Sequence, residues 1–389
     1  MGNTLITPSV IAKEALLQLE NNVCMANLVH RDYKKEFVKV GSTVSIRKPV
    51  KFVASDGATR VNQDVSESTT SIVIDKQKHV SWEFSAVDLT LTIEEYSKRY
   101  IEPACIALAN QVDRDLCGLY IDLYNSVGTV NSTPTAYTTF AAAARRLDEE
   151  AVPDDGKRVV VLDPAAAWSL IGNNTAGSGI TTLFNEEVVR KALREGYLGM
   201  LANMKTYKNQ NISLHTPGSD FTTVTITTAG QTGSTITSAG GNFLKGDMFS
   251  IAAVNAVNPI SRQSTGVVRN FVCTADGTTS LSIRPSIISS GAYQTVNTTN
   301  LVNAVMTAIG TASTAYTNSL AFHKNCFALV MIPIELPDSC AFKGRETHNN
   351  LSIAVVKDFD IDTYKEVIRL DVLYGVKTIY PEFGVRILG

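Results

Sequence analysis

Apolar residues near the start of the chain recur every three or four positions, with polar residues between them. The apolar positions are Val10, Ile11, Ala15, Leu16, Leu19 and Val23. This spacing lines up one face of a helix and predicts a single amphipathic helix within residues 1–35. Two roles fit such a helix: it docks on its own domain, or it is an arm that packs on a partner.

The pattern changes to a period of two between residues 38 and 86, which predicts half-buried strands. The alternating apolar positions are Val44, Ile46, Val50, Phe52, Ile72, Ile74, Val80, Trp82 and Phe84. A polar stretch over residues 54–68, which carries Ser55-Asp56-Gly57, separates the two arms. We therefore expect a long two-stranded excursion with a solvated tip. A lone ribbon of this kind is marginally stable in water, which favours support from a neighbouring subunit.

A second, longer helix is predicted from Pro103 towards Tyr124, because proline suits a first helical turn. One apolar stripe runs along it through Cys105, Leu108, Val112, Leu116, Leu119 and Leu123. The helix is about 30 Å long if it reaches Tyr124. Upstream, the side chains of Thr92 and Glu95 have the spacing of a capping box, in which each satisfies a backbone donor of the other.

Residues 157–200 read as alternating strand and helix. A short buried strand is expected over residues 159–162, followed by a helix that Asp163 caps, Pro164 begins and Gly172 ends. Asn185 is placed to cap a further helix that ends before Gly196.

Composition shifts near residue 213, and from Phe221 to Gly240 Thr, Gly and Ser are frequent and no residue is charged. Eight threonines lie between Phe221 and Gly240. Short strands are expected over residues 248–257, 267–274 and 281–284, with Asp276-Gly277 as a hairpin turn signal. Residues 213–320 therefore predict an all-β insertion, sandwich-like or barrel-like. After the insertion, the apolar run at 327–334 and the strands over 364–388 return to the mixed helix-and-strand composition of the scaffold.

Overall charge is balanced, with 35 Lys and Arg residues against 37 Asp and Glu residues. Because the charges balance, the sequence indicates no basic surface for binding nucleic acid. Any DNA partner is therefore expected to be enclosed rather than bound directly. The six cysteines are scattered, no secretory signal is recognisable, and no stretch has the length and apolarity of a membrane span. We expect a soluble protein made in a reducing compartment.

Candidate chemistry is sparse, and we predict no catalytic residue, no cofactor and no metal. Four residues have ligand chemistry but lack paired zinc spacing, and they are His323, Cys326, Cys340 and His348. The acidic pairs Glu149/Glu150 and Asp154/Asp155 flank Pro153 and Gly156, which is typical of a solvated turn rather than of acid–base catalysis. No nucleophile elbow, phosphate loop or dinucleotide fingerprint occurs.

Charged residues on the predicted ribbon are the best candidates for a functional surface. They are Arg47, Lys48, Lys51, Asp56 and Arg60. We expect them to meet charges on a neighbouring subunit, because the ribbon needs external support. The alternative is that they are solubilising charges that guard an edge strand against aggregation.

The order of these elements, and several local motifs, resemble the tailed-phage major capsid proteins with the Hong Kong ninety-seven-type fold. The motifs are Thr92-Ile93-Glu94-Glu95-Tyr96, Ile101-Glu102-Pro103-Ala104, Leu108-Ala109-Asn110-Gln111-Val112-Asp113, Val161-Leu162-Asp163-Pro164-Ala165-Ala166, the segment 199–207 and the segment 367–376. Within the β insertion, three motifs are similar to the short-tailed-phage coat branch, and they are Lys245-Gly246-Asp247, Ala256-Val257-Asn258-Pro259 and Ser264-Thr265-Gly266.

The resemblance implies an α+β capsid fold with an all-β insertion domain. Its parts would be an N-terminal arm over 1–37, an extended β loop over 38–86, and a spine helix with a discontinuous peripheral domain over 87–139. An axial domain would combine 140–212 with 321–389, around an insertion at 213–320. The spine helix itself would occupy 102–125. The family offers no catalytic residues, and the Lys–Asn crosslink of a few members has no recognisable match.

The function that this resemblance implies is self-assembly into an icosahedral shell of hexamers and pentamers around double-stranded DNA. Scaffolding and portal proteins would be partners, and the precursor shell would expand on maturation. The site of assembly would be the host bacterial cytoplasm, and no membrane would be involved. Two alternatives from other classes are a hydrolase that uses the acidic residues near 150, and an extracellular adhesion or tail protein suggested by the Thr-rich module.

Overall fold

The computed structural model describes residues 8–32, 43–54, 57–60, 62–63, 67–85, 97–172, 198–219, 224–228, 230–299, 301, 303–336, 340, 342–360 and 365–389. The chain divides into two compact units, each assembled from separate segments. The first contains Met1–Arg47, Thr69–Leu116 and Phe327–Lys377, and the second contains Lys48–Ser68, Cys117–Cys326 and Thr378–Gly389. The predicted capping box at 92–95 and the helix after Asn185 lie outside the described residues.

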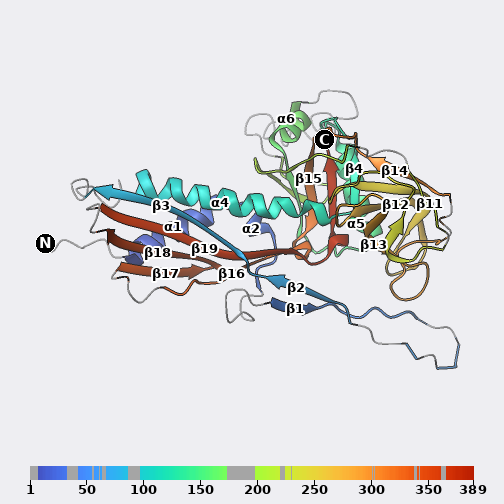
Figure 1. The fold of residues 1–389 in the computed structure, drawn as a ribbon, viewed down its shortest axis with the longest axis horizontal. Helices are drawn as coiled ribbons and strands as arrows, with labels where there is room; N and C mark the ends of the chain where they lie inside the picture. Colours follow the sequence, from blue (N-terminus) through green and yellow to red (C-terminus); the bar gives the residue numbers. More distant parts are fainter. Residues whose placement is uncertain are drawn as a thin grey trace. The chain divides into compact units, whose positions relative to one another are not determined.

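The first unit is built on a sheet that has five strands among the described residues. They are β3 (Lys76–Ser85), β16 (Phe327–Met331), β17 (Phe342–His348), β18 (Leu351–Asp360) and β19 (Lys365–Thr378). Figure 1 shows β3, β19, β18 and β17 running side by side. The long strand β19 pairs with β18 and with β3, both antiparallel. Alternation along β3 follows the predicted period of two, since Val80 and Trp82 are half-buried between exposed neighbours.

The predicted N-terminal helix forms as α1 (Pro8–Asn22), and it packs on β17 and β18. Its inward stripe includes Ile11, Leu16 and Leu19, which are buried, whereas Val10 is exposed. A short helix, α2 (Met25–Leu28), follows. The described part of the N-terminal segment thus docks on its own unit.

The predicted second helix forms as α4 (Glu102–Cys117), with one buried stripe that includes Leu108, Val112 and Leu116. A π-helical turn, η3 (Ser97–Ile101), precedes it. The predicted continuation to Tyr124 is wrong. The α-helix ends after 16 residues, about 24 Å, and the chain tightens into the 3₁₀ helix η4 (Gly118–Asp122). Glycine is a poor former of α-helix interiors, which accounts for the change at Gly118.

The ribbon is shorter than the period-two pattern suggested. Strands β1 (Thr43–Arg47) and β2 (Thr69–Val73) pair antiparallel as a two-stranded sheet. The expected strand at Val50 and Phe52 does not form, and β3 belongs to the larger sheet. Alternation therefore identified extended segments but not which sheet each one joins.

The second unit contains a mixed sheet that has seven strands among the described residues. They are β4 (Asn125–Gly128), β5 (Arg158–Leu162), β6 (Met200–Leu201), β7 (Met204–Lys208), β8 (Leu214–His215), β15 (Tyr316–His323) and β20 (Gly384–Leu388). Strand β5 is buried along its whole length, as predicted. Helices α5 (Tyr137–Glu149) and α6 (Pro164–Gly172) pack on this sheet through Phe140, Leu147 and Leu170. Asp163 caps α6 as expected, because its carboxylate accepts the Ala165 N–H at 2.9 Å.

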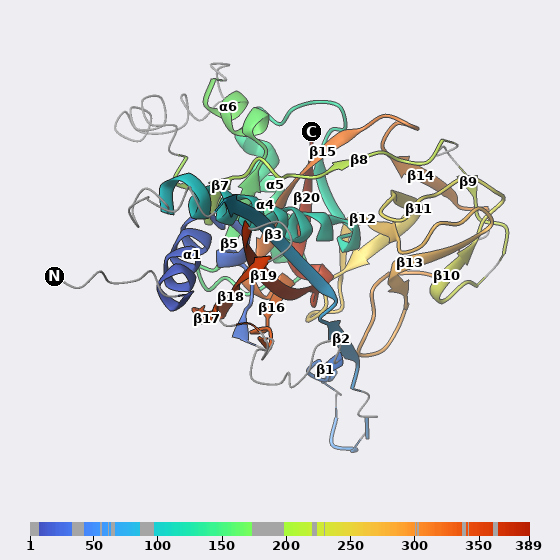
Figure 2. The ribbon, with the colours of Figure 1, turned by 60° about the vertical axis from the view of Figure 1, so that its left-hand side comes forward.

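The predicted β insertion forms a second sheet in this unit, with six strands in the described part. They are β9 (Val224–Thr225), β10 (Gly233–Thr237), β11 (Met248–Val257), β12 (Ser264–Cys273), β13 (Ser280–Ile287) and β14 (Val305–Ile309), and Figure 2 shows them gathered together. A backbone bridge between Ile226 and Ser238 joins the two end strands, so the sheet closes into a barrel. Phe243, Phe249 and Phe271 are among the residues that fill its core.

The expected turn at Asp276-Gly277 does lie between β12 and β13, but it is not a two-residue hairpin turn. The connection spans residues 274–279, and Gly277 forms a backbone bridge with Phe243 instead. Two short 3₁₀ helices, η5 (Lys324–Cys326) and η6 (Pro381–Phe383), complete the unit. Among the described helices, none is long and apolar enough to cross a membrane.

Candidate functional site

The part of the ribbon beyond β1 and β2, Lys48–Ser68, belongs to the second unit and is held by two local contacts. The Lys48 N–H donates to the Ser68 carbonyl at 2.9 Å, so the two arms stay paired one step beyond β1 and β2. Farther out, the Gln63 side chain accepts the Val53 N–H at 2.9 Å and donates to the Val53 carbonyl. These contacts keep the segment from Lys48 to Phe52 extended without a strand partner.

The structure brings together two of the five ribbon residues predicted as contacts. Lys48 and Lys51 line the same cavity. Arg47 is exposed at the end of β1, and Arg60 is exposed farther along the ribbon. Asp56 lies outside the described residues. The role of all five residues in contacts between subunits stays a prediction.

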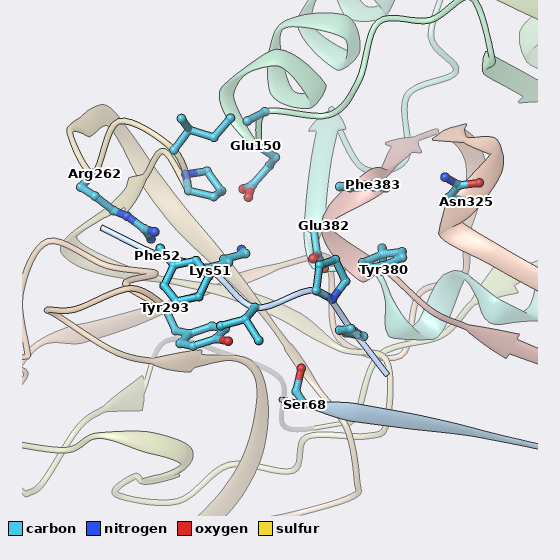
Figure 3. A pocket seen from close by; sticks show the side chains of 16 residues that line it. Lys51, Phe52, Ser68, Glu150, Arg262, Tyr293, Asn325, Tyr380, Glu382 and Phe383 are labelled. Atoms are coloured by element: carbon cyan, nitrogen blue, oxygen red, sulfur yellow. The ribbon is translucent and has the colours of Figure 1, made fainter. Parts of the chain in front are cut away.

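The cavity has a volume of about 560 Å³, which is within the usual range for ligand pockets. Figure 3 shows Phe52, Tyr293 and Arg262 on one wall and Tyr380 and Glu382 on the opposite one. The lining comes from the ribbon, the end of α5, the turn between β11 and β12, a loop after β13, and the turn around η6. Sequence reasoning proposed Lys48 and Lys51 as contact residues but did not place them in a cavity, because Arg262, Tyr293 and Tyr380 lie far from them in the chain.

Burial and positive charge dominate the electrostatics of this cavity. Burial lowers the pKa of the Lys48 ammonium, and the attraction of Glu382 only partly opposes that effect. The Lys48 Nζ lies 5.0 Å from the centre of the Tyr380 ring, a cation–π distance. Burial also raises the pKa of the Tyr380 hydroxyl, so this ring remains neutral at physiological pH. On the far wall, the Nη1 of Arg262 is buried without a hydrogen-bond partner among the described residues.

One wall of the cavity contains an ion pair that the sequence did not reveal. The Glu150 carboxylate, 3% exposed, pairs with the Arg269 guanidinium, 4% exposed. Arg269 also lies 4.7 Å from the centre of the Tyr124 ring. Burial raises the pKa of Glu150, against the attraction of Arg269. The expectation that Glu150 belongs to a solvated turn is therefore wrong, because this carboxylate ties α5 to strand β12 of the barrel.

A second buried polar cluster holds the barrel to the mixed sheet. His215 Nε2 lies 2.8 Å from an Asp247 carboxylate oxygen, and His215 Nδ1 lies 3.0 Å from the Tyr120 hydroxyl. The other Asp247 oxygen accepts the Leu244 and Gly218 N–H groups. Arg386, fully buried, donates to the Gly246 carbonyl at 2.9 Å. These contacts fix the motif Lys245-Gly246-Asp247 against its surroundings.

The four residues considered as metal ligands do not converge. His323 Nε2 lies 3.0 Å from Asp155, and His348 Nδ1 lies 3.0 Å from Glu20. Cys326 is buried, and burial raises the pKa of its thiol well above the usual value. In the part of the chain that the structure describes, no group of three or more His, Cys, Asp or Glu side chains is arranged to hold a metal. The buried carboxylate of the cavity wall, Glu150, is already paired with Arg269.

Comparison with known proteins relates this arrangement to phage coat proteins. Residues 230–389 match the family described as P22 coat protein - gene protein 5. The matched stretch begins before β10 and therefore includes most of the barrel and the whole C-terminal return through β19 and β20. No curated protein sequence matches the chain.

A solved structure of low sequence identity shares the fold of this chain. A chain from Mycobacterium phage Che8 is 18% identical, with a TM-score of 0.52, over 94% of this chain and 90% of that one. The capsid structure of the cyanophage P-SCSP1u is 12% identical, with a TM-score of 0.49, over 94% and 87%. The capsid of Ralstonia phage GP4 is 11% identical, with a TM-score of 0.47, over 93% and 86%.

The family match and the shared fold confirm two predictions from the sequence. The resemblance to tailed-phage coat proteins is confirmed, and the fold is the α+β Hong Kong ninety-seven-type capsid fold.

Proposed function

We propose that this chain is the major capsid protein of a tailed phage and assembles into an icosahedral shell around double-stranded DNA. One observation carries the proposal. The region that matches the P22 coat protein family, residues 230–389, is folded together with a long helix and a ribbon in a phage capsid fold. The work of such a protein is mechanical, and we expect no catalytic role for it.

Assembly would use contacts between different surfaces of identical subunits. Such heterologous contacts close into rings when the rotation allows, and hexamers and pentamers are rings of this kind. Individual contacts need not be strong, because many of them act together in a closed shell. We further propose a scaffolding protein that guides a precursor shell, a portal protein, assembly in the host cytoplasm, and expansion on maturation.

The proposal includes a division of the chain into five parts. They are an arm over 1–37, a loop over 38–86, a spine and peripheral part over 87–139, an axial part over 140–212 and 321–389, and an insertion over 213–320. Two features support it. The ribbon β1–β2 has two strands and pairs with no further described strand, which is the arrangement that needs a neighbour. The barrel has its own closed core, which suits a separately folding insertion.

The ribbon charges supply the intersubunit contacts in this proposal. Arg47, Lys51 and Arg60 are exposed, and together with Lys48 they make the described ribbon basic. Contacts through such a surface would weaken with salt, because exposed charges are screened at high ionic strength. Electron microscopy of the purified chain, expressed with and without its neighbouring genes, tests the proposal. Closed shells or hexagonally textured sheets are expected, and a monodisperse monomer under both conditions would refute it.

A further inference from the structure

The cavity beside residues 48–52 gathers three cations that have no carboxylate partner among the described residues. Lys48 and Lys51 reach it from the ribbon, and Arg262 reaches it from the turn between β11 and β12. None of the three forms an ion pair in the described part of the chain, and the Arg262 Nη1 is buried without any hydrogen bond. Lys51 is exposed and Lys48 is half-buried, whereas the Arg262 Nη1 is a buried donor. A buried donor without a partner is costly, so this arrangement points to a missing anionic group.

The acidic residues that line the cavity do not neutralise it. Glu150 is fully engaged with Arg269 inside the wall. Glu382 is the remaining lining carboxylate among the described residues, and it faces Lys48 only at longer range. The positive charge of Arg284 and Lys51 also acts on Lys48 and helps to lower its pKa. The interior of the cavity is therefore left with an excess of positive charge.

The apolar side chains at the rim favour a peptide over a nucleic acid. Ile260 is 77% exposed and Phe52 is 61% exposed, and both line the cavity beside Tyr293. Large apolar side chains exposed together mark a surface that is covered in a complex. A duplex backbone offers phosphates but no apolar side chains to cover this rim. The near-neutral net charge of the chain, −2, also gives no long-range attraction for DNA.

We propose that this cavity binds an acidic peptide segment of another protein during shell assembly, with carboxylates at Lys48, Lys51 and Arg262 and an apolar side chain against Phe52 and Ile260. The proposal rests on the capsid function. A guanidinium such as that of Arg262 binds carboxylates through paired hydrogen bonds, and the half-buried Lys48 gains more from an anion than a fully exposed lysine does.

The experiment uses the full chain and fluorescence anisotropy. The probe is a short fluorescein-labelled peptide in which Asp and Glu alternate with Leu and Phe, and its counterpart carries Asn and Gln at the acidic positions. The variants are Lys51→Gln alone and Lys51→Gln with Arg262→Gln. Arg60→Gln is the matched control, because Arg60 is an exposed ribbon cation outside the cavity. Thermal unfolding of each variant verifies that it is folded.

We expect the acidic peptide to bind and the neutral one to bind at least tenfold more weakly. The double variant should lose about tenfold or more in affinity, Lys51→Gln less, and Arg60→Gln almost nothing. Binding should also weaken as salt is added. Equal binding of both peptides, unchanged binding by the folded single and double variants, or stronger binding of a duplex DNA oligonucleotide at the same site would overturn the proposal.

Shell formation by the same preparations separates this inference from the proposed function. Normal shells from a chain that does not discriminate between the peptides would overturn the peptide site and leave the capsid function intact. Specific peptide binding by a chain that never assembles would overturn the capsid function while supporting the chemistry of the cavity.

Discussion

Removal of Arg269 should destabilise the second unit strongly, because the substitution leaves the Glu150 carboxylate buried without its partner. The two side chains are 4% and 3% exposed, so water does not replace the lost interaction. With charge centres about 4 Å apart and an effective dielectric of about 20, their attraction is about 4 kcal/mol. Breaking one side of a buried pair typically costs about 3–5 kcal/mol. We therefore expect Arg269→Met to lower the free energy of unfolding by about 3–5 kcal/mol at neutral pH.

The loss should depend on pH in a definite direction. Burial already raises the pKa of Glu150, and removal of Arg269 raises it further. In Arg269→Met the folded state therefore binds a proton more readily than the unfolded state does, so lower pH favours folding of the variant. The difference from the unsubstituted chain should shrink as the pH falls from 8 to about 5.

Urea denaturation followed by circular dichroism measures these free energies. Replacement of both partners, Arg269→Met with Glu150→Gln, should cost clearly less than the sum of the two single changes, since no charge is then left unpaired. Arg145→Ala is the matched control, because the Arg145 side chain is exposed. Its pair with Glu149 at 3.1 Å should contribute less than about 0.5 kcal/mol to the free energy of unfolding. A loss below about 1 kcal/mol for Arg269→Met, or additive single changes, would refute the reasoning.

Three further predictions concern other parts of the chain. The buried Asp113 carboxylate accepts the backbone N–H groups of Cys24 and Met25, at 2.9 and 3.0 Å. Asp113→Ala should therefore lower the free energy of unfolding by about 3 kcal/mol and speed hydrogen exchange in the N-terminal segment, whereas Arg114→Ala should do neither. Gly375→Ala places a Cβ 2.3 Å from a carbonyl oxygen of β2 and should lower the stability of the fold by about 2 kcal/mol or more. Gly118→Ala meets nothing within 4 Å and should be tolerated, and thermal unfolding of both variants measures the difference. Asp155→Asn removes a carboxyl whose pKa is lowered mainly by its hydrogen bond with Lys157. Below pH 4 the unsubstituted chain should therefore lose up to about 1 kcal/mol more folding free energy than the variant. Parallel plots of stability against pH would contradict this.

Local patterns in the sequence predicted several elements of the fold. Helical spacing identified α1 and α4, and the Asp163-Pro164 pair identified the start of α6. The Thr-rich, uncharged stretch from Phe221 to Gly240, with the short strands expected after it, indicated the β insertion. These features succeed because periodicity and capping depend on residues close together in the chain. The end of α4 was misplaced because its apolar stripe continues through Leu123 while the backbone changes to a 3₁₀ helix.

Pairing between distant residues could not be predicted from one sequence. Glu150 stands in a turn-like context, and nothing nearby indicates that its partner is Arg269, 119 residues later. The cavity has the same property, since Lys48, Arg262 and Tyr380 come together only through tertiary packing. The two lysines were singled out because a lone ribbon needs external support, and nothing in the sequence indicated the cavity.

The most direct test of the central claim is cryo-electron microscopy of particles formed by the full chain. The account predicts closed icosahedral shells built from rings of six and five copies, with the ribbon of each copy in contact with a neighbouring copy. Particles without this symmetry, or a chain that remains monomeric at every concentration and with its neighbouring genes present, would contradict it.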